Sequence, residues 1–400
     1  MAIIATVHPI NEFMMQGFTT FLLFLVMTNA FSLGTRVIAQ SASQDSREAS
    51  DSFNETVKKT TGDNPDEAAS WADLQLNRIV FGSCIKQDQP MPIFRQMLSH
   101  QPDLALLIGD NIYGDTADMT VMREKYAKLR GNTDFAAFEA QVPLLATWDD
   151  HDFGMNDAGA DFSQRSASQE EFLRFWGIPT SSPRWNRPGV YDSKLIGPKG
   201  QQVQVILLDT RYFRSPLRKG AQRRVAGPYV PDVDTTKTML GEVQWAWLEE
   251  QLRVPAELRL MVTSIQCIPE AAGQETWSNL PAERTRLLEL FESMKVEGVV
   301  LLSGDRHWAE LSVYQNRTGY PIYEFTSSSL NQKHPRGTPS RNRFRADSKT
   351  FHQENFGLIE IEWEGNDPGI TLQLRDKDNL VQLQKTLSFG ELRWDDQGRP

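Results

Sequence analysis

The stretch LLIGDNIYGD, from Leu106 to Asp115, decides how the rest of the chain is interpreted. Its apolar run ends at Ile108, and Gly109 and Asp110 follow at once. A short apolar run that stops at a glycine and an aspartate is typical of a buried strand ending in a turn. Tyr113 then adds a phenol close to Asp110. Because ligands bind beyond the carboxyl ends of strands in open α/β sheets, this strand is predicted to deliver polar groups to a site.

The same pattern, an apolar strand followed by polar side chains, recurs along the chain. These side chains are Ser83 and Cys84, Asp110, Asp149 to Asp152, Asp209 to Arg211, Gln266, and Asp305 to His307. One such ending is usually a turn former or a helix cap. Several at equivalent ends of one sheet would gather unpaired carboxylates, whose repulsion and desolvation are costly. Bound cations relieve that cost, and oxygen-rich ligation with one or two nitrogens suits Ca, Mg, Mn or Fe better than a structural zinc.

The order of apolar segments predicts an α/β fold with a largely parallel sheet. Strands are expected at 78–82, 104–108, 144–148, 204–208, 260–264 and 299–302, and helices at 93–98, 119–129, 170–176, 241–252 and 284–294. After Ala309 the pattern becomes β-rich, with strands expected at 311–314, 322–325, 358–363, 370–374 and 381–387. We therefore expect one domain with two sheet layers and helices outside them.

Composition and missing motifs exclude several functions. The 400 residues carry a formal net charge of −10, which disfavours general nucleic-acid binding because phosphate backbones attract a basic surface. The stretch GDNIYGD lacks the alternating acidic positions and final glutamate of an EF-hand. The sequence also contains no GxxxxGK[ST] phosphate loop and no GxSxG nucleophile elbow.

Six motifs, in order, resemble one family. FGSC, GDNIYGD, ATWDDHDFGMND, LDTR, LGEVQWAWLEEQL and LLSGDRHWAE are similar to the alkaline phosphatase D (PhoD-like) family of the calcineurin-like metallophosphoesterases. The resemblance covers roughly Asn77 to Leu387. It implies a four-layer α/β/β/α sandwich and hydrolysis of phosphomonoesters, phosphodiesters or both. The nucleophile implied by the resemblance is a hydroxide bound at a dinuclear or multinuclear metal centre.

The resemblance also implies the metal ligands. It suggests an iron(III) ion held by Cys84, Asp110, Tyr113 and His307, and a calcium or other divalent ion held by Asp110, Asp150 and Asp305. Mn, Mg or Zn are the alternative metals. A highly charged cation stabilises a tyrosinate and deprotonates a coordinating thiol, which fits this donor set.

Three further residues carry predicted catalytic roles. His151 falls on the catalytic histidine of the superfamily, where it would protonate the leaving alkoxide or hold a phosphate oxygen. Arg211 is expected to pair with the phosphate in a bidentate manner. Asn156 is expected to donate to the phosphate or to bind a metal. Asp115 receives no role, and the superfamily's additional metal-binding histidine has no counterpart, because Ser264 and Gln266 stand there.

Each assignment has a structural alternative. Cys84 is either a ligand, a small buried apolar residue or the partner of Cys267 in a disulfide. Tyr113 is either a ligand or a core aromatic residue. Arg211 either contacts substrate or bridges acidic groups. At the level of function, the alternatives are a phospholipid or nucleotide phosphodiesterase at the cell surface and an inactive metal- or ligand-binding protein on the same fold.

The N-terminus predicts export. The apolar run from Phe18 to Met27 is short for a membrane span, and Val37-Ile38-Ala39 resembles a signal-peptidase site. No Lys or Arg precedes the run, so an uncleaved anchor is the alternative. The predicted organisation is a signal peptide at 1–39, a flexible linker at 40–75, a catalytic domain at 76–390 and a tail at 391–400. We expect a periplasmic, cell-surface or extracellular monomer that takes a phosphate ester as substrate and contacts membrane only through an uncleaved N-terminus.

Overall fold

The computed structural model describes residues 71–224, 227–270, 273–315, 319–334, 341–365 and 368–394. The chain divides into two units, Met1–Asp63 and Asn64–Pro400, and the described residues all belong to the second. The predicted signal peptide and most of the predicted linker lie outside them. Within these ranges, no helix has both the length and the apolar character needed to cross a membrane.

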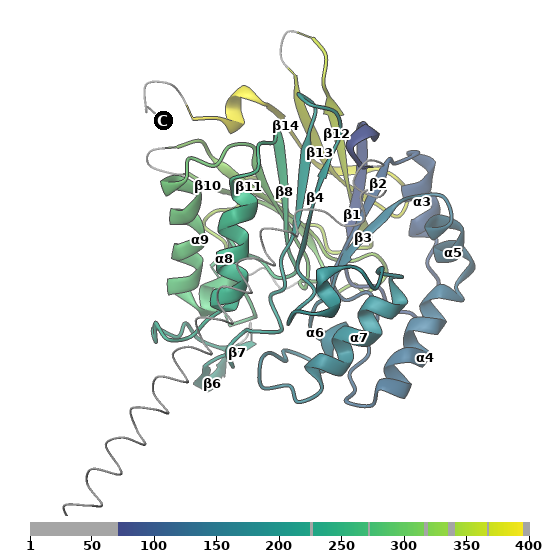
Figure 1. The fold of residues 1–400 in the computed structure, drawn as a ribbon, viewed down its shortest axis with the longest axis vertical. Helices are drawn as coiled ribbons and strands as arrows, with labels where there is room; N and C mark the ends of the chain where they lie inside the picture. The colour runs from purple at the N-terminus through teal and green to yellow at the C-terminus, as the bar shows by residue number, and fades with distance from the viewer. Residues whose placement is uncertain are drawn as a thin grey trace, which may run out of the picture. The chain divides into compact units, whose positions relative to one another are not determined.

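Two six-stranded sheets form the two central layers (Figure 1). The first sheet contains, in spatial order, β14 (Val381–Ser388), β13 (Gly369–Asp376), β12 (Asn355–Glu362), β1 (Arg78–Gly82), β2 (Leu104–Ile108) and β3 (Leu144–Thr147). The second contains β10 (Ala309–Tyr314), β11 (Ile322–Ser327), β9 (Val299–Ser303), β8 (Leu258–Thr263), β5 (Val203–Leu207) and β4 (Asp192–Ile196). Strands β1, β2 and β3 are parallel, as are β5, β8, β9 and β11.

The central strands are apolar because both of their faces are covered. Every residue of β2 (LALLI) and of β9 (VVLLS) is buried. In β1, Ile79 and Phe81 pack in the core shared with the second sheet, whereas Val80 packs in a separate core beneath the outer helices. Strands buried on both faces are typically continuous apolar runs, which explains why these segments were recognisable from the sequence.

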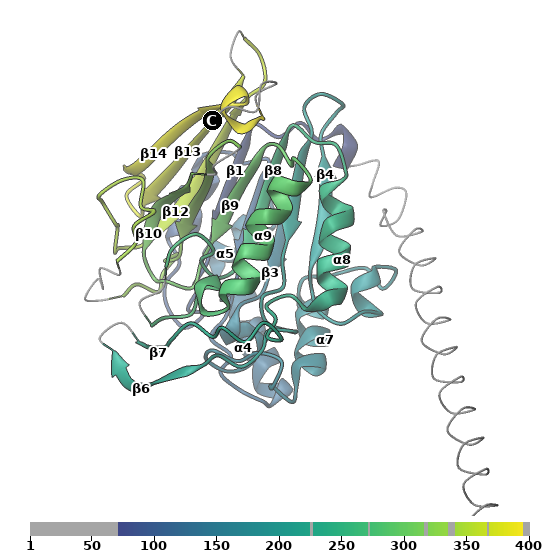
Figure 2. The ribbon, with the colours of Figure 1, turned by 90° about the vertical axis from the view of Figure 1, so that its left-hand side faces the viewer.

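Helices cover the outer face of each sheet (Figure 2). Beside the first sheet lie α3 (Ile93–Ser99), α4 (Met119–Arg130), α5 (Thr133–Glu139) and α7 (Arg165–Phe175). Beside the second lie α8 (Gly241–Leu252) and α9 (Pro281–Ser293). Phe94 of α3 and Met122 of α4 share one core with Leu107 of β2, and Trp245 of α8 shares the other core with β8. The predicted α/β/β/α order of layers is confirmed.

Smaller elements complete the domain. They are α6 (Asp150–Phe153), the hairpin of β6 (Lys219–Arg224) and β7 (Gly227–Tyr229), and three short 3₁₀ helices at Pro183–Trp185, Trp277–Asn279 and Gly390–Leu392. None of these elements was predicted from the sequence, and neither were β4 and α5.

One expectation about the sheets is wrong. The polar strand ends were expected along one sheet, but β1, β2 and β3 belong to the first sheet and β5, β8 and β9 to the second. The C-terminal β-rich part is likewise divided, because β10 and β11 extend the second sheet while β12, β13 and β14 extend the first. Apolar periodicity identifies a strand but does not say which of two stacked sheets it joins.

Candidate metal centre

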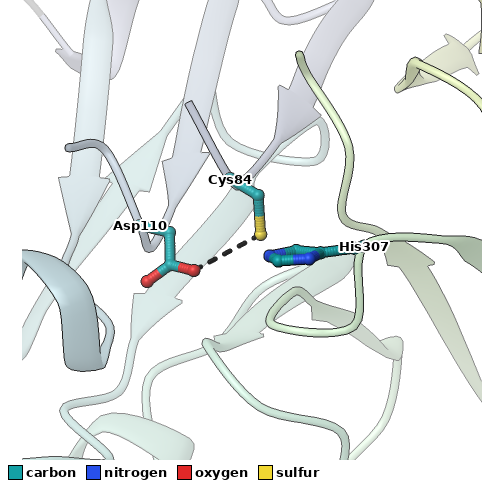
Figure 3. A group of neighbouring side chains, drawn as sticks. All are labelled: Cys84, Asp110 and His307. Atoms are coloured by element: carbon teal, nitrogen blue, oxygen red, sulfur yellow. Dashed lines mark hydrogen bonds between the residues drawn. The ribbon is translucent and has the colours of Figure 1, made fainter. Parts of the chain in front are cut away.

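The carboxyl ends of strands from both sheets meet at one site. Potential ligand atoms within 4.8 Å of one another form four overlapping groups, which are Cys84, Asp110 and His307; Asp110, Asp150 and His151; Asp149, Asp150 and Asp305; and Asp150, Asp157 and Glu275. Figure 3 shows the first group, with the three side chains pointing toward one another. All six predicted metal ligands are therefore either in these groups or, in the case of Tyr113, hydrogen-bonded to a member of one.

The backbone at this site adopts the left-handed conformation repeatedly. The φ angles are 63° at Cys84, 50° at Asp110, 67° at Asp305 and 57° at His307. Non-glycine residues rarely adopt positive φ, and such residues cluster at functional sites where the surrounding structure enforces them. Gly109, with φ of 118°, lies so close to the end of β3 that an added Cβ would stand 2.7 Å from the Cβ of Asp149. The glycine of the opening motif thus permits two strand ends to approach.

Four kinds of potential metal ligand, a thiol, a carboxylate, a phenol and an imidazole, surround the first candidate metal position. The Sγ atom of Cys84 lies 3.5 Å from Oδ2 of Asp110, and the hydroxyl of Tyr113 lies 3.5 Å from the same oxygen. The Tyr113 hydroxyl is 2.8 Å from Nε2 of His307. Burial raises the pKa of Cys84 to about 12 and lowers the pKa of His307 to about 4. Without a cation these groups stay neutral, and neutral imidazole is the form that binds metals.

The structure excludes one alternative for Cys84. Both Cys84 and Cys267 are free and fully buried, so no disulfide joins them. Cys84 also differs from an ordinary buried cysteine, because a carboxylate and an imidazole lie beside its sulfur. Ligation by Cys84 and by Tyr113 stays a prediction that this arrangement favours.

Carboxylates dominate the second candidate position. Backbone N–H groups of His151 and Asp157 donate to the two oxygens of Asp150, at 2.9 and 2.6 Å. Burial raises the pKa of Asp150, but Arg211 and His151 outweigh burial and lower it to about 2. Burial, together with the charge of Asp149, raises the pKa of Asp305 well above its usual range. When no cation is present, Asp150 is therefore expected to be ionised and the neighbouring Asp305 protonated, because two adjacent buried carboxylates repel each other.

Asp149 supplies the test of whether these residues fit a cation. Its Oδ1 accepts from Ser264 at 2.6 Å and from Arg211 at 2.6 Å, whereas its Oδ2 is buried without a partner among the described residues. A buried carboxylate oxygen without a partner is costly. A cation placed among Asp149, Asp150 and Asp305 would satisfy this oxygen, so the donor set fits. The sequence analysis did not name Asp149 as a ligand, although the doubled aspartate of DDHD was the available signal.

His151 is held by a residue that had no assigned role. Its Nδ1 lies 2.7 Å from Oδ1 of Asp115, and its ring lies 4.2 Å from the ring of Tyr113 between centroids. Burial lowers the pKa of His151, but Asp150 and Asp115 outweigh burial and raise it to about 9. The side chains of His151 and Asp115 are 14% and 41% exposed, so this pair is open to solvent. The arrangement presents a protonated imidazole at the edge of the candidate metal centre.

Arg211 is buried rather than open to a substrate. Its side chain is 0% exposed and pairs with Asp149 at 2.5 Å and with Glu275 at 2.7 Å, and Arg214 pairs with Glu275 at 2.9 Å. This geometry favours the alternative that Arg211 bridges acidic groups, and substrate contact stays a prediction. Glu275 was missed because it lies in a loop without a strand-end signal. Asn156 is exposed, and its role also stays a prediction.

Comparison with known proteins agrees with the resemblance in the motifs. Residues 196–372 match the family model described as PhoD-like phosphatase. The matched segment is thus similar to the PhoD-like phosphatase family. Alkaline phosphatase D of Bacillus subtilis is 23% identical over 305 residues, covering 66% of this chain and 52% of that protein. The chain thus spans about half the length of this curated relative.

One of two aligned solved structures supports the fold. The structure titled "Structure of PhoD" aligns with a TM-score of 0.58 at 18% identity, covering 80% of this chain and 72% of that one. A structure described as a dimetal phosphatase from Danio rerio aligns with a TM-score of 0.49 at 10% identity, covering 79% and 99%. The first match confirms the predicted metallophosphoesterase-type fold.

Proposed function

We propose that the chain is a metal-dependent phosphoric ester hydrolase that acts on phosphomonoesters, phosphodiesters or both. The observation that carries this proposal is the convergence of six predicted ligands at one buried site, namely Cys84, Asp110, Tyr113, Asp150, Asp305 and His307. The match to the PhoD-like phosphatase family and the name of the Bacillus relative support the same reaction class.

The donor chemistry suggests which metal each part of the site would hold. Cys84, Asp110, Tyr113 and His307 would hold iron(III), since thiolate and phenolate suit a highly charged ion. Asp110, Asp149, Asp150 and Asp305 would hold calcium or another divalent ion, with Mn, Mg or Zn as alternatives, since calcium, magnesium and manganese favour oxygen ligands. Bound cations would supply Lewis acidity that stabilises charge developing on the phosphoryl oxygens.

The protein's own contribution to the reaction centres on His151. Asp115 accepts from Nδ1, which orients the ring and leaves the Nε2–H free to donate. We infer that His151 gives this proton to the leaving alkoxide, the usual role of a positioned imidazolium. Arg211 acts indirectly by fixing Asp149, whose carboxylate it contacts through both Nε and a terminal nitrogen.

A direct assay tests the proposed reaction. The full chain, stripped of metal with a chelator and then supplied with iron(III) and calcium, is expected to hydrolyse nitrophenyl phosphate, bis-nitrophenyl phosphate or both. Asp347→Asn is a matched control, because Asp347 is half-buried outside the candidate ligand groups and its carboxylate accepts from the backbone N–H of Lys349. A folded, metal-loaded protein that hydrolyses neither compound would refute the proposal.

We further propose that the protein is exported. The apolar run from Phe18 to Met27 and the small residues before Gln40 support this, and both lie outside the described residues. N-terminal sequencing of protein recovered outside the cytoplasm is expected to begin at Gln40. A product that begins at Met1 or Met14 and stays with the membrane would support the uncleaved anchor instead.

A further inference from the structure

A serine in the loop after β11 touches both a cysteine and a histidine of the candidate metal centre. Ser328 is fully buried, and its Oγ lies 3.2 Å from Sγ of Cys84. The backbone N–H of His307 donates to the same Oγ at 2.8 Å. Cys84 follows a strand of the first sheet and His307 a strand of the second. The Oγ atom of Ser328 therefore contacts both the part of the site that follows the first sheet and the part that follows the second.

The protonation state of the sulfur decides the direction of this contact, because either atom could be the donor. A serine hydroxyl has one proton and two lone pairs. The Ser328 oxygen already accepts from His307, and a metal-bound thiolate carries no proton, so in the metal-bound state the Ser328 hydroxyl is the donor to Sγ of Cys84. The other hydroxyl near the sulfur, that of Ser83 at 3.4 Å, has the carbonyl of Ser327 as an alternative acceptor at 3.3 Å. Ser328 is thus the better placed donor to the sulfur.

The loop that contains Ser328 also forms backbone hydrogen bonds near Cys84 and near His307. The N–H of Leu330 donates to the carbonyl of Ser83 at 3.0 Å, and that of Gln332 donates to the carbonyl of Cys84 at 3.2 Å. The N–H of His334 donates to the carbonyl of His307 at 3.2 Å. Because Cys84 and His307 both have positive φ, these bonds hold conformations that the residues would otherwise rarely adopt.

We propose that Ser328 is a positioning residue that donates a hydrogen bond to the metal-bound sulfur of Cys84 while it fixes His307. The proposal rests on the metal centre proposed above and adds a residue that the motifs do not contain. A hydrogen bond to a thiolate draws charge from the sulfur and weakens its donation to the metal. Ser328 would thereby raise the reduction potential of bound iron and hold the sulfur and imidazole at a fixed separation.

Two variants of the same loop separate this role from simple packing. Ser328→Ala removes the hydroxyl at the sulfur. Ser329→Ala removes a hydroxyl that is equally buried but donates to the carbonyl of Gln332. Both proteins are stripped of metal, loaded with iron(III), and compared with the wild type by iron titration, visible spectroscopy and redox titration.

Ser328→Ala is expected to bind iron about 10–100-fold more weakly, because the loss of the contacts that hold the sulfur and His307 in place outweighs the stronger donation from the sulfur. Its sulfur-to-iron charge-transfer band is expected at lower energy and its reduction potential lower than in the wild type. Ser329→Ala is expected to match the wild type in all three measurements, and Ser328→Thr, which keeps a hydroxyl, is expected to restore most of the wild-type spectrum.

A measurement on the wild type removes any dependence on the folding of the variants. In heavy water, the iron–sulfur stretch in the resonance Raman spectrum is expected to shift, because the Ser328 hydroxyl proton that is donated to the sulfur is exchangeable. An unshifted stretch, or a Ser328→Ala protein with the spectrum and iron affinity of the wild type, overturns the role of Ser328 and leaves the proposed reaction standing. A folded wild-type protein that takes up no metal overturns both.

Discussion

Two buried acidic clusters lie next to each other and balance their charge differently. The arginine-paired cluster consists of Asp149, Glu275, Arg211 and Arg214, in which each carboxylate contacts a guanidinium. The open cluster consists of Cys84, Asp110, Tyr113 and His307. Within the described ranges, no ion pair joins Asp110 to a lysine or arginine. The described residues supply arginines to the first cluster and no lysine or arginine to the second.

The difference shows in the electrostatics of the two clusters. The carboxylates around Arg211 outweigh its burial and raise its pKa well above the usual range, which stabilises its charge. Burial, with Cys84 and Asp150 nearby, raises the pKa of Asp110 well above its usual range. An Asp110 that is ionised at neutral pH therefore needs a cation from outside the chain. The comparison indicates that the open cluster requires a metal, whereas in the arginine-paired cluster the arginines neutralise the carboxylates and leave Oδ2 of Asp149 available to a cation.

The largest effect is expected from Asp110→Asn, which removes the carboxylate shared by both candidate metal positions. Losing several kcal/mol of transition-state stabilisation corresponds to an activity loss of about 1,000-fold or more. Steady-state hydrolysis of nitrophenyl phosphate and elemental analysis of the purified variant check this. Asp347→Asn is expected to keep activity and metal. Wild-type activity in Asp110→Asn would mean that the open cluster is not the metal centre.

The arginine-paired cluster is tested by Arg211→Met. Removing one partner of a buried ion pair leaves an uncompensated charge and costs about 3–5 kcal/mol of unfolding free energy. Urea unfolding of the metal-free protein measures this cost. The control is Arg286→Met, which breaks the exposed pair with Glu242 and is expected to cost about 0–1 kcal/mol. Equal costs for the two variants would contradict the structural role assigned to Arg211.

Metal removal is expected to destabilise the protein through the open cluster. A ligand present at 100 times its dissociation constant stabilises the folded state by about 2.7 kcal/mol, and a chelator removes that contribution. Thermal unfolding with increasing calcium, and separately with iron(III), measures the gain. Asp110→Asn is expected to show no such gain with iron(III), whereas Arg286→Met should respond as the wild type does. A wild-type midpoint that is indifferent to both metals would count against a bound cation.

The sequence predicted those parts of the fold that depend on continuous apolar runs. Strands β2 and β9 are buried on both faces, so their residues are apolar throughout and their ends are marked by glycine and aspartate. Strand β4 (DSKLI) alternates buried and half-buried residues, and α6 has four residues that include three charged or titratable side chains. Neither has a length or periodicity that distinguishes it from a loop.

The residues of the candidate site also fall into those that the sequence could predict and those that it could not. Strand ends gave Cys84, Asp110 and Asp150 as polar groups near a common edge, and the family resemblance supplied their roles. Arg211 was recognisable as a cation after a strand, but its partner Glu275 comes from a loop 64 residues later in the chain. Ser328 stands among three consecutive serines, and sequence gives no reason to prefer one of them. Such pairings depend on how loops return to the site, which local patterns do not encode.

The smallest effect is expected from Asp115→Asn, which tests the proton donor beside the open cluster. With its pKa raised to about 9, His151 is protonated below that pH and loses its proton as pH rises through it. Activity that needs this proton should therefore fall above about pH 9. The stability of the fold should change with pH in the same direction. Because folding raises the pKa of His151 from 6.5 to about 9, protonated His151 stabilises the fold fully below pH 6.5, and this stabilisation is lost as the pH rises through about 9.

Asp115→Asn removes one of the three carboxylates that raise the pKa of His151, so the alkaline limb of the activity profile should move to lower pH. The expected loss is about tenfold at pH 8.5, smaller than for loss of the general acid itself. The control is Asp118→Asn, because Asp118 is the exposed N-cap of α4 and asparagine caps equally well. An alkaline limb that stays in place in Asp115→Asn would show that the limb does not report His151, and the proton donor would then have to be sought elsewhere at the edge of the open cluster.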